Sequence, residues 1–318
     1  MLLGCAKKPA EQQGAKQEVI DEDGQHFVVG QIFSDRMKKA LYGPELIVIQ
    51  GGKFQQGALK GDKSAQENEK PQHQVEIAQT YAMSRTEITV AQFREFIKNT
   101  GYKTQADKVK SSSVFDLASG KLVKKEAVNW RFNHIGELSG DDFPVVHVSF
   151  DDAKAYVQWL SARTNKVYRL PTESEWEYAF RAETDSIYPW GKKLEELRDG
   201  NLSGDQDKLP NKRILGNAIK NYADSHWGLA PVRQYTTEGF GTFDLLGNAS
   251  EWVEDCWHDS YRRAPINAEA WVNPGCARRV VRGSSWLSAA DQSRISYRSS
   301  SISDASNALV GFRVIRVL

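Results

Sequence analysis

The sequence shows no excess of charge of either sign. Its 318 residues include 42 Lys and Arg against 41 Asp and Glu. Proteins that bind nucleic acid or an anionic membrane surface usually gather basic residues into a patch. No apolar stretch approaches the roughly 20 residues that a membrane span requires. The sequence therefore predicts neither a nucleic-acid partner nor a membrane-spanning helix.

Histidines are few, and their spacing does not fit a familiar metal site. No pair has the His-x-x-x-His or His-Glu-x-x-His spacing that zinc and iron sites use. The six are His26, His73, His134, His147, His226 and His258. The sequence also lacks a Gly-x-Ser-x-Gly elbow and a phosphate-binding loop. The sequence therefore provides no candidate catalytic residue for these kinds of site.

Cysteine is scarce, and the first of the three has a distinctive setting. Cys5 follows Leu2-Leu3-Gly4, which resembles a bacterial lipobox, although the usual charged and apolar regions before it are missing. Residues 7–24 are polar and predict a flexible tether. We expect a lipid anchor on Cys5 in the bacterial cell envelope, at the outer-membrane surface. The alternative is a chance Leu-Leu-Gly-Cys at a disordered end.

The other two cysteines are Cys256 and Cys276. An even pair outside the cytoplasm favours a disulfide. Two buried free thiols are the alternative.

Strand and helix signals concentrate in the first part of the chain. Residues 46–49 are a short β-type run stopped by two glycines, and residues 74–77 alternate between apolar and polar. Three helix starts are predicted, at Thr89, at Ser149 and at a Thr172-x-x-Glu175 capping box. Aromatic residues at helical spacing follow each start, and they indicate buried core rather than a cofactor site.

From about Tyr188 onward the helical periodicity disappears, and glycine, asparagine, aspartate and tryptophan dominate. This half is predicted to consist of loops with short strands, including strands at residues 280–282 and 310–317 that bracket a polar insert. No linker divides the chain. We therefore predict a tether over residues 1–40 and one domain over residues 41–318.

Eight segments in order resemble the formylglycine-generating enzymes and sulfatase-modifying factors. They are PELIVIQGGKF (44–54), YAMSRTEITVAQF (81–93), FPVVHVS (143–149), YRLPTESEWEYA (168–179), PWG (189–191), LGNASEW (246–252), VRGSSW (281–286) and GFR (311–313). The resemblance covers residues 43–318. It implies an α+β, C-type-lectin-like fold that is rich in loops and has short strands and a few helices.

The catalytic cysteines of that family are absent. The resemblance places them two and seven residues after the tryptophan of the Gly-Gly-Ser-Trp motif, where this chain has Ser288 and Ser293. A pair of thiolates binds Cu(I), a soft ion, whereas a serine hydroxyl is a hard ligand that cannot replace a thiolate. The sequence therefore predicts that the oxidase reaction is lost.

The resemblance also implies structural calcium. The first site comprises Asp244, Gly247, Ala249 and Glu251, and the second comprises Asn201, Leu202, Asp224 and His226. Carboxylates together with backbone carbonyls suit a hard cation. The alternative is that Asp244 and Glu251 only cap local turns.

The least usual segment is residues 284–310, in which ten residues are Ser. It resembles the C-terminal variable region of proteins diversified by retroelements, in which adenines of selected codons are randomised. We expect the variable ligand-binding region at about residues 280–318, with Trp286, Gln292 and Phe312 as fixed scaffold. The candidate binding residues are Ser288, Ala289, Asp291, Ser293, Ser299, Ser300, Ser301, Ser303, Asp304, Ser306, Asn307, Ala308 and Leu309. A solvated serine-rich loop without function is the alternative.

These observations favour a surface-displayed, non-catalytic protein that binds a protein or glycan ligand at its C-terminal face. The second hypothesis is an extracytoplasmic oxidoreductase or maturation factor of the same family with altered chemistry. A purely structural envelope lipoprotein is the third.

Overall fold

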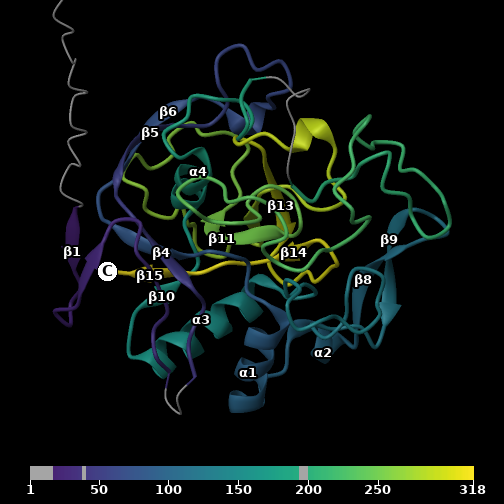
Figure 1. The fold of residues 1–318 in the computed structure, drawn as a ribbon, viewed down its shortest axis with the longest axis horizontal. Helices are drawn as coiled ribbons and strands as arrows, with labels where there is room; N and C mark the ends of the chain where they lie inside the picture. Colours follow the sequence, from purple (N-terminus) through teal and green to yellow (C-terminus); the bar gives the residue numbers. More distant parts are fainter. Residues whose placement is uncertain (1–16, 38–40, 193–199) are drawn as a thin grey trace, which may run out of the picture.

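The computed structural model describes residues 17–37, 41–192 and 200–318. Within these residues, four α-helices and many short strands surround long irregular segments, so the α+β, loop-rich prediction is confirmed (Figure 1). Residues from about 200 onward, green to yellow in Figure 1, wind across one side of the molecule with few regular elements.

A five-stranded antiparallel sheet forms the first half of the scaffold. Its strand order is β10-β15-β7-β4-β3. The strands are β3 (Ile32–Phe33), β4 (Leu46–Ile49), β7 (Tyr81–Ser84), β10 (Tyr168–Arg169) and β15 (Ile315–Val317). The C-terminal strand thus lies between two strands that come much earlier in the chain, and it closes the domain.

Three of the described helices begin at the predicted caps, and one that follows Thr104 was not predicted. They are α1 (Val90–Thr100), α2 (Gln105–Val109), α3 (Phe150–Thr164) and α4 (Glu173–Arg181). The hydroxyls of Thr89, Ser149 and Thr172 each accept a hydrogen bond from the third helical residue, which satisfies an otherwise unpaired backbone N–H group. None of the described helices has the length and apolar character needed to cross a membrane.

The aromatic stripes of α1 and α3 form the main core. Phe93, Phe96 and Tyr156 are at most 2% exposed and pack edge-to-face or stacked on one another. Phe312, which comes just before β15, joins the same cluster. The prediction that these residues are core is confirmed.

The second sheet carries the serine-rich segment. Its order is β13-β12-β11-β14, with β14 parallel to β11 and the other pairs antiparallel. The strands are β11 (Ser250–Cys256), β12 (Arg278–Arg282), β13 (Arg298–Ile302) and β14 (Val310–Gly311). Val281 faces Ser299 across the β12–β13 pair.

One expectation about this region is corrected. Residues 310–317 are not one strand, because β14 joins the second sheet and β15 the first, with the buried Phe312 between them. The polar insert, for which no element was predicted, contains β13 and a short 3₁₀ turn at Ala290–Gln292. The physical reason is that buried arginines, described below, bind this segment to the scaffold.

Three two-stranded hairpins complete the fold. They are β1 (Glu18–Ile20) with β2 (His26–Val28), β5 (Gly52–Gln56) with β6 (His73–Ile77), and β8 (Ser111–Asp116) with β9 (Lys121–Glu126). The β8–β9 hairpin projects at the right of Figure 1, far from β1 at the left.

The predicted tether is too long at its C-terminal end. Residues 17–37 contain β1, β2 and β3, Phe27 is fully buried, and Asp21 lies 2.6 Å from the guanidinium of Arg316. An apolar ring and a buried ion pair hold this stretch on the domain despite its polar composition. Cys5 and the rest of residues 1–16 lie outside the described residues.

A disulfide joins Cys256, at the end of β11, to Cys276, just before β12. The Cα atoms are 6.0 Å apart. This is the pairing that the sequence favoured over two free thiols, and it closes the irregular connection between two strands of the second sheet.

Candidate ligand-binding site

A cavity of about 380 Å³ lies on one face of the second sheet. All four strands contribute to its lining: Ser250 from β11, Val281 from β12, Ser299 and Ser301 from β13, and Val310 from β14. Because side chains alternate across a strand, Ser299 and Ser301 point to the same face of β13.

The walls of the cavity come from the segments on either side of β13. Residues 285–297 provide one wall, and Asn307 and Leu309 provide another. Asn217 also lines the cavity, from the irregular segment that precedes β11. Six of the predicted binding residues therefore converge on one cavity. They are Ser288, Ser299, Ser300, Ser301, Asn307 and Leu309.

The structure does not place the other seven predicted residues in the cavity. Ser293 and Ala308 are at most 1% exposed, whereas Asp291 and Asp304 are exposed elsewhere. Ala289, Ser303 and Ser306 also do not line it. The backbone explains part of this separation, since Ser306 and Ser303 accept hydrogen bonds from Ser113 and Phe150 and so serve the scaffold.

Sequence reasoning missed part of the lining. Gln292, predicted as scaffold, lies in the cavity wall, where its side chain accepts from the Ala289 N–H and donates to the Tyr297 hydroxyl at 3.2 Å. Ser285 and Leu287 also contribute. Trp286 is buried beside Phe115, as a fixed scaffold residue would be.

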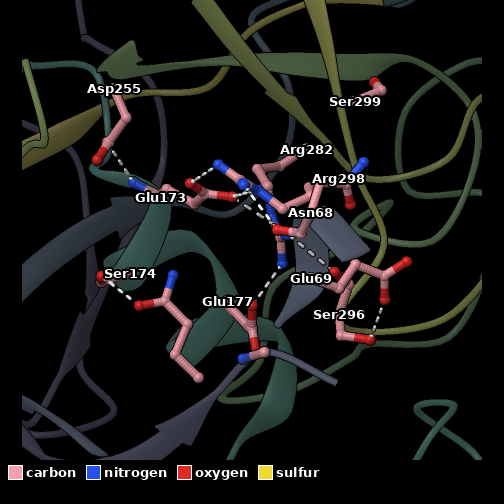
Figure 2. A network of polar contacts seen from close by, with 12 residues as sticks. Asn68, Glu69, Glu173, Ser174, Glu177, Asp255, Arg282, Ser296, Arg298 and Ser299 are labelled. Atoms are coloured by element: carbon pink, nitrogen blue, oxygen red, sulfur yellow. Dashed lines mark hydrogen bonds and ion pairs between the residues drawn. The ribbon is translucent and has the colours of Figure 1, made fainter. Parts of the chain in front are cut away.

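Behind β13 lies a buried network of charges, shown in Figure 2. Arg298 donates to both carboxylate oxygens of Glu173, at 2.7 and 2.8 Å. Arg282 donates to Glu177 at 2.8 Å, and all four side chains are at most 4% exposed. Ser299 points away from this cluster in Figure 2. One face of β13 therefore binds the buried charges, and the other borders the cavity.

Electrostatics keep this network charged. Burial acts to raise the pKa of Glu173, but the guanidinium groups of Arg298 and Arg282 outweigh it and hold the pKa below its usual value. The paired charges thus fix β12 and β13 to helix α4, at a depth where an unpaired charge would be very costly.

A second buried cluster fixes the segment before β13. Arg294 donates to Glu69 at 2.6 Å and to Asp62 at 2.9 Å, and the Ser296 hydroxyl donates to Glu69 at 2.8 Å. The cavity wall is therefore tied to a loop more than 200 residues earlier.

The two serines at the expected cysteine positions occupy different environments. Ser288 lines the cavity, and its hydroxyl accepts from the Ser285 N–H at 2.9 Å. The Ser293 hydroxyl is buried and donates to the Ala289 carbonyl at 3.0 Å. Both hydroxyls thus serve local hydrogen bonds.

The predicted first calcium site contains unpaired buried oxygens. Within the described part of the chain, Asp244 Oδ1 and Glu87 Oε2 have no hydrogen-bond partner. Burial raises the pKa of Asp244 to about 6, and burial followed by the charge of Asp244 raises the pKa of Glu87 well above its usual range. Unpaired buried carboxylate oxygens fit a hard cation.

Glu251 fits that site less well. Its carboxylate accepts two hydrogen bonds from Arg313, at 2.7 and 2.9 Å, and one from the Trp176 indole at 2.7 Å. Gly247 and Ala249 would offer backbone carbonyls. Among the described residues near this site, the carboxylate oxygens without a hydrogen-bond partner thus belong to Asp244 and to Glu87, which was not predicted.

The residues of the second predicted calcium site do come together. Asp224 accepts from the backbone N–H groups of Leu202 and His226, both at 2.8 Å. Asn201 adjoins Gly247 of the first site through a β-bridge, and Asn201 Oδ1 is buried without a partner among the described residues. In the part of the chain that the structure describes, no three His, Cys, Asp or Glu side chains cluster with metal-binding geometry, so any cation here would rely on carbonyl ligands.

Comparison with known proteins identifies the family. A model described as the sulfatase-modifying factor enzyme 1-like domain matches residues 33–318. The chain belongs to this family. The formylglycine-generating enzyme of Streptomyces coelicolor is 31% identical over 286 residues, which cover 83% of this chain and 87% of that protein. The inactive C-alpha-formylglycine-generating enzyme 2 of Bos taurus is 31% identical over 294 residues, with 84% and 86% coverage.

Solved structures show the same fold. PvdO from Pseudomonas aeruginosa has a TM-score of 0.69 at 29% identity and covers 91% of this chain and 98% of its own. Treponema denticola variable protein 1 has a TM-score of 0.62 at 18% identity, with 91% and 99% coverage, and so shares the fold. The relatives include both enzymes and proteins named as inactive. Family membership alone therefore does not tell whether this chain is catalytic, which depends on the side chains at its site.

Proposed function

We propose that this protein is a non-catalytic ligand-binding member of the sulfatase-modifying factor family. The binding site is the cavity over the β13-β12-β11-β14 sheet. The observation that supports this most directly is the convergence of Ser288, Ser299, Ser300, Ser301, Asn307 and Leu309 on one cavity of about 380 Å³. A small concave site with a few polar groups is the usual form of a ligand pocket.

The chemistry of the side chains supports a non-catalytic role. Ser288 and Ser293 stand where the family resemblance places the cysteine pair, and their hydroxyls are engaged in local hydrogen bonds. Relatives named as inactive occur at the same level of identity as the enzymes. The family therefore accommodates chains without the oxidase reaction.

The arrangement of β13 suits a surface that varies between copies. Arg298 and its partners hold one face of the strand, so substitutions at Ser299 and Ser301 on the other face leave those contacts in place. Surface substitutions away from such contacts usually change stability by no more than about 0.5 kcal/mol. The fold is also that of a Treponema variable protein, which is consistent with this proposal.

We further propose a lipid anchor on Cys5, display at the outer-membrane surface and structural Ca²⁺ at the two sites described above. Together they would place a rigid, variable pocket outside the cell. Metabolic labelling with a fatty acid tests the anchor, since Cys5→Ala would remove the label from the protein.

The decisive test is genetic. We would sequence the gene from a population of cells and search its neighbourhood for a near-copy of codons 280–318 beside a reverse transcriptase. We expect substitutions at adenine positions of the cavity codons, with Trp286 and Phe312 unchanged. A uniform sequence without a near-copy would contradict diversification.

The family relationship to formylglycine-generating enzymes favours one alternative, an oxidoreductase with altered chemistry. Cu(I) titration of the purified protein tests it, with Ser288→Cys/Ser293→Cys as the matched variant. We expect Cu(I) binding only in the double cysteine variant. A redox metal bound stoichiometrically by the unmodified protein would favour the alternative.

A further inference from the structure

We infer that the ligand of this cavity is an uncharged carbohydrate, with one end of a glycan seated in the pocket. This inference rests on the proposed function and specifies the ligand class of the same site. The deciding feature is the lining: among the described residues that border the cavity, none is Asp, Glu, Lys, Arg or His.

An ionised ligand would lose hydration on entering the cavity without meeting an opposite charge. Burying a charge without a partner is strongly unfavourable. Of the guanidinium groups on β12 and β13, Arg298 is paired with Glu173 behind the strand, and the exposed Arg278 lies outside the lining of the cavity. A phosphate, sulfate or carboxylate group is therefore disfavoured, and so is an ammonium group.

The polar groups instead offer neutral donors and acceptors side by side. The Tyr297 hydroxyl accepts from Gln292, so it keeps an O–H to donate. Ser299 donates to the Val281 carbonyl, which leaves its oxygen lone pairs to accept. Each sugar hydroxyl is likewise both donor and acceptor, so it can pair with either kind of group.

Asn307 adds a further neutral donor. Its Oδ1 accepts from the Leu309 N–H at 2.8 Å, which orients the amide and leaves the Nδ2 hydrogens for a ligand. This contact also holds the cavity wall in place. The hydrogen-bonding groups are therefore pre-positioned, which lowers the entropy cost of binding.

The apolar part of the cavity lining also suits a sugar ring. Leu287, Leu309, Val281 and Val310 line the cavity with the ring of Tyr297, and amphipathic rings such as tyrosine pack well against a surface that is apolar on one side and polar at its rim. Sugar rings have apolar C–H faces between their hydroxyls. At about 380 Å³ the cavity is at the small end of ligand sites, which suits the end of a glycan better than a folded partner.

The test uses the intact chain on two printed arrays. One carries glycans in neutral, sialylated and sulfated forms, and the other carries uncharged Ser/Asn-rich peptides. Ser301→Trp fills the cavity, and Ser303→Trp is the matched control because Ser303 lies two residues on and outside the lining. We expect binding to neutral glycans, at least a tenfold loss in Ser301→Trp, and no loss in Ser303→Trp, with both variants keeping the melting temperature of the parent.

Three outcomes would overturn the inference. A preference for sialylated or sulfated glycans would contradict the charge argument. Peptide binding that Ser301→Trp abolishes would retain the proposed binding site but reject carbohydrate as its ligand. Binding to neither array would reject the carbohydrate, while the population sequencing described above tests the proposed diversification of the site separately.

Discussion

At the scale of single residues, this protein depends on polar groups buried in pairs. His147 is fully buried at a φ of 60°. Its Nδ1 meets the Ser112 hydroxyl at 2.8 Å and its Nε2 the Asn133 carbonyl at 3.0 Å, while its backbone N–H donates to Asn307 beside the cavity. The neutral ring therefore connects β8 to Asn133, and the backbone N–H of the same residue contacts the cavity wall.

This arrangement predicts acid sensitivity. Burial lowers the pKa of His147 to about 4 from an ordinary value of 6.5, so the unfolded chain binds the proton more readily. The contribution of His147 to stability is complete above pH 6.5 and decreases between pH 6.5 and 4, by up to about 1.4 kcal/mol per pH unit.

We expect His147→Asn, a residue that tolerates positive φ, to remove that part of the pH dependence. Urea unfolding of both proteins between pH 4 and 7 measures it. His134, the neighbouring titratable group whose pKa is also lowered, remains in both proteins. Parallel stability curves would contradict the assignment.

Arg298 supplies a second residue-scale prediction. Removing it leaves Glu173 buried with a weaker partner, Arg282 at 3.4 Å. We expect Arg298→Ala to destabilise the fold by about 3 kcal/mol or more, because a buried charge loses its main partner. Denaturant unfolding checks this, and Arg278→Ala, on the same sheet but exposed, is the control with an expected effect of at most about 0.5 kcal/mol. Equal losses in the two variants would refute the role of burial.

At the scale of elements, the helices and the second sheet are stabilised differently. The helices carry their own start signals, such as Thr172 and Glu175. The strands of the second sheet are joined by long irregular segments and depend on links between distant residues. The Cys256–Cys276 disulfide is one of them, and it closes a connection of 20 residues between β11 and β12.

Removing that disulfide tests its contribution. In the chain-entropy description, a loop of this length stabilises the folded state by about 3 kcal/mol. We expect Cys256→Ser/Cys276→Ser to lower the unfolding free energy by about that amount and to match the parent protein measured in a reductant. A double variant as stable as the oxidised parent would show that the ionic clusters suffice to hold the sheet.

At the scale of the whole molecule, the fold has extensive loops, and several buried oxygens have no hydrogen-bond partner among the described residues. Asp244, Glu87 and Asn201 each contribute one. A bound cation would satisfy them and join loops that few strands connect. Calcium would therefore act on the global stability of the domain rather than on chemistry.

Calcium titration measures this effect. A ligand that binds only the folded state adds about 2.7 kcal/mol at a concentration 100 times its dissociation constant. We expect Ca²⁺ to raise the melting temperature, a chelator to reverse the rise, and Asp244→Ala to reduce the response. Asp304→Ala, an exposed carboxylate outside both sites, should respond like the parent. A melting temperature indifferent to Ca²⁺ and chelator would argue against both sites.

Much of this protein follows from its sequence, because the signals are local. Thr89, Ser149 and Thr172 cap helices through contacts three residues away, and the serine positions after Trp286 predict the loss of the cysteine pair without any coordinates. The ordered motifs identified the family and hence the loop-rich fold.

Only the tertiary structure decided which serines face a ligand and which are scaffold. Ser299 and Ser293 are the same residue type in the same segment, yet one lines the cavity and the other is buried. Arg298 is buried because Glu173 lies beside it, 125 residues away in sequence. A polar side chain is buried only where a partner from a distant part of the chain pairs with it. The hydrophobic periodicity of a local segment does not reveal such a partner.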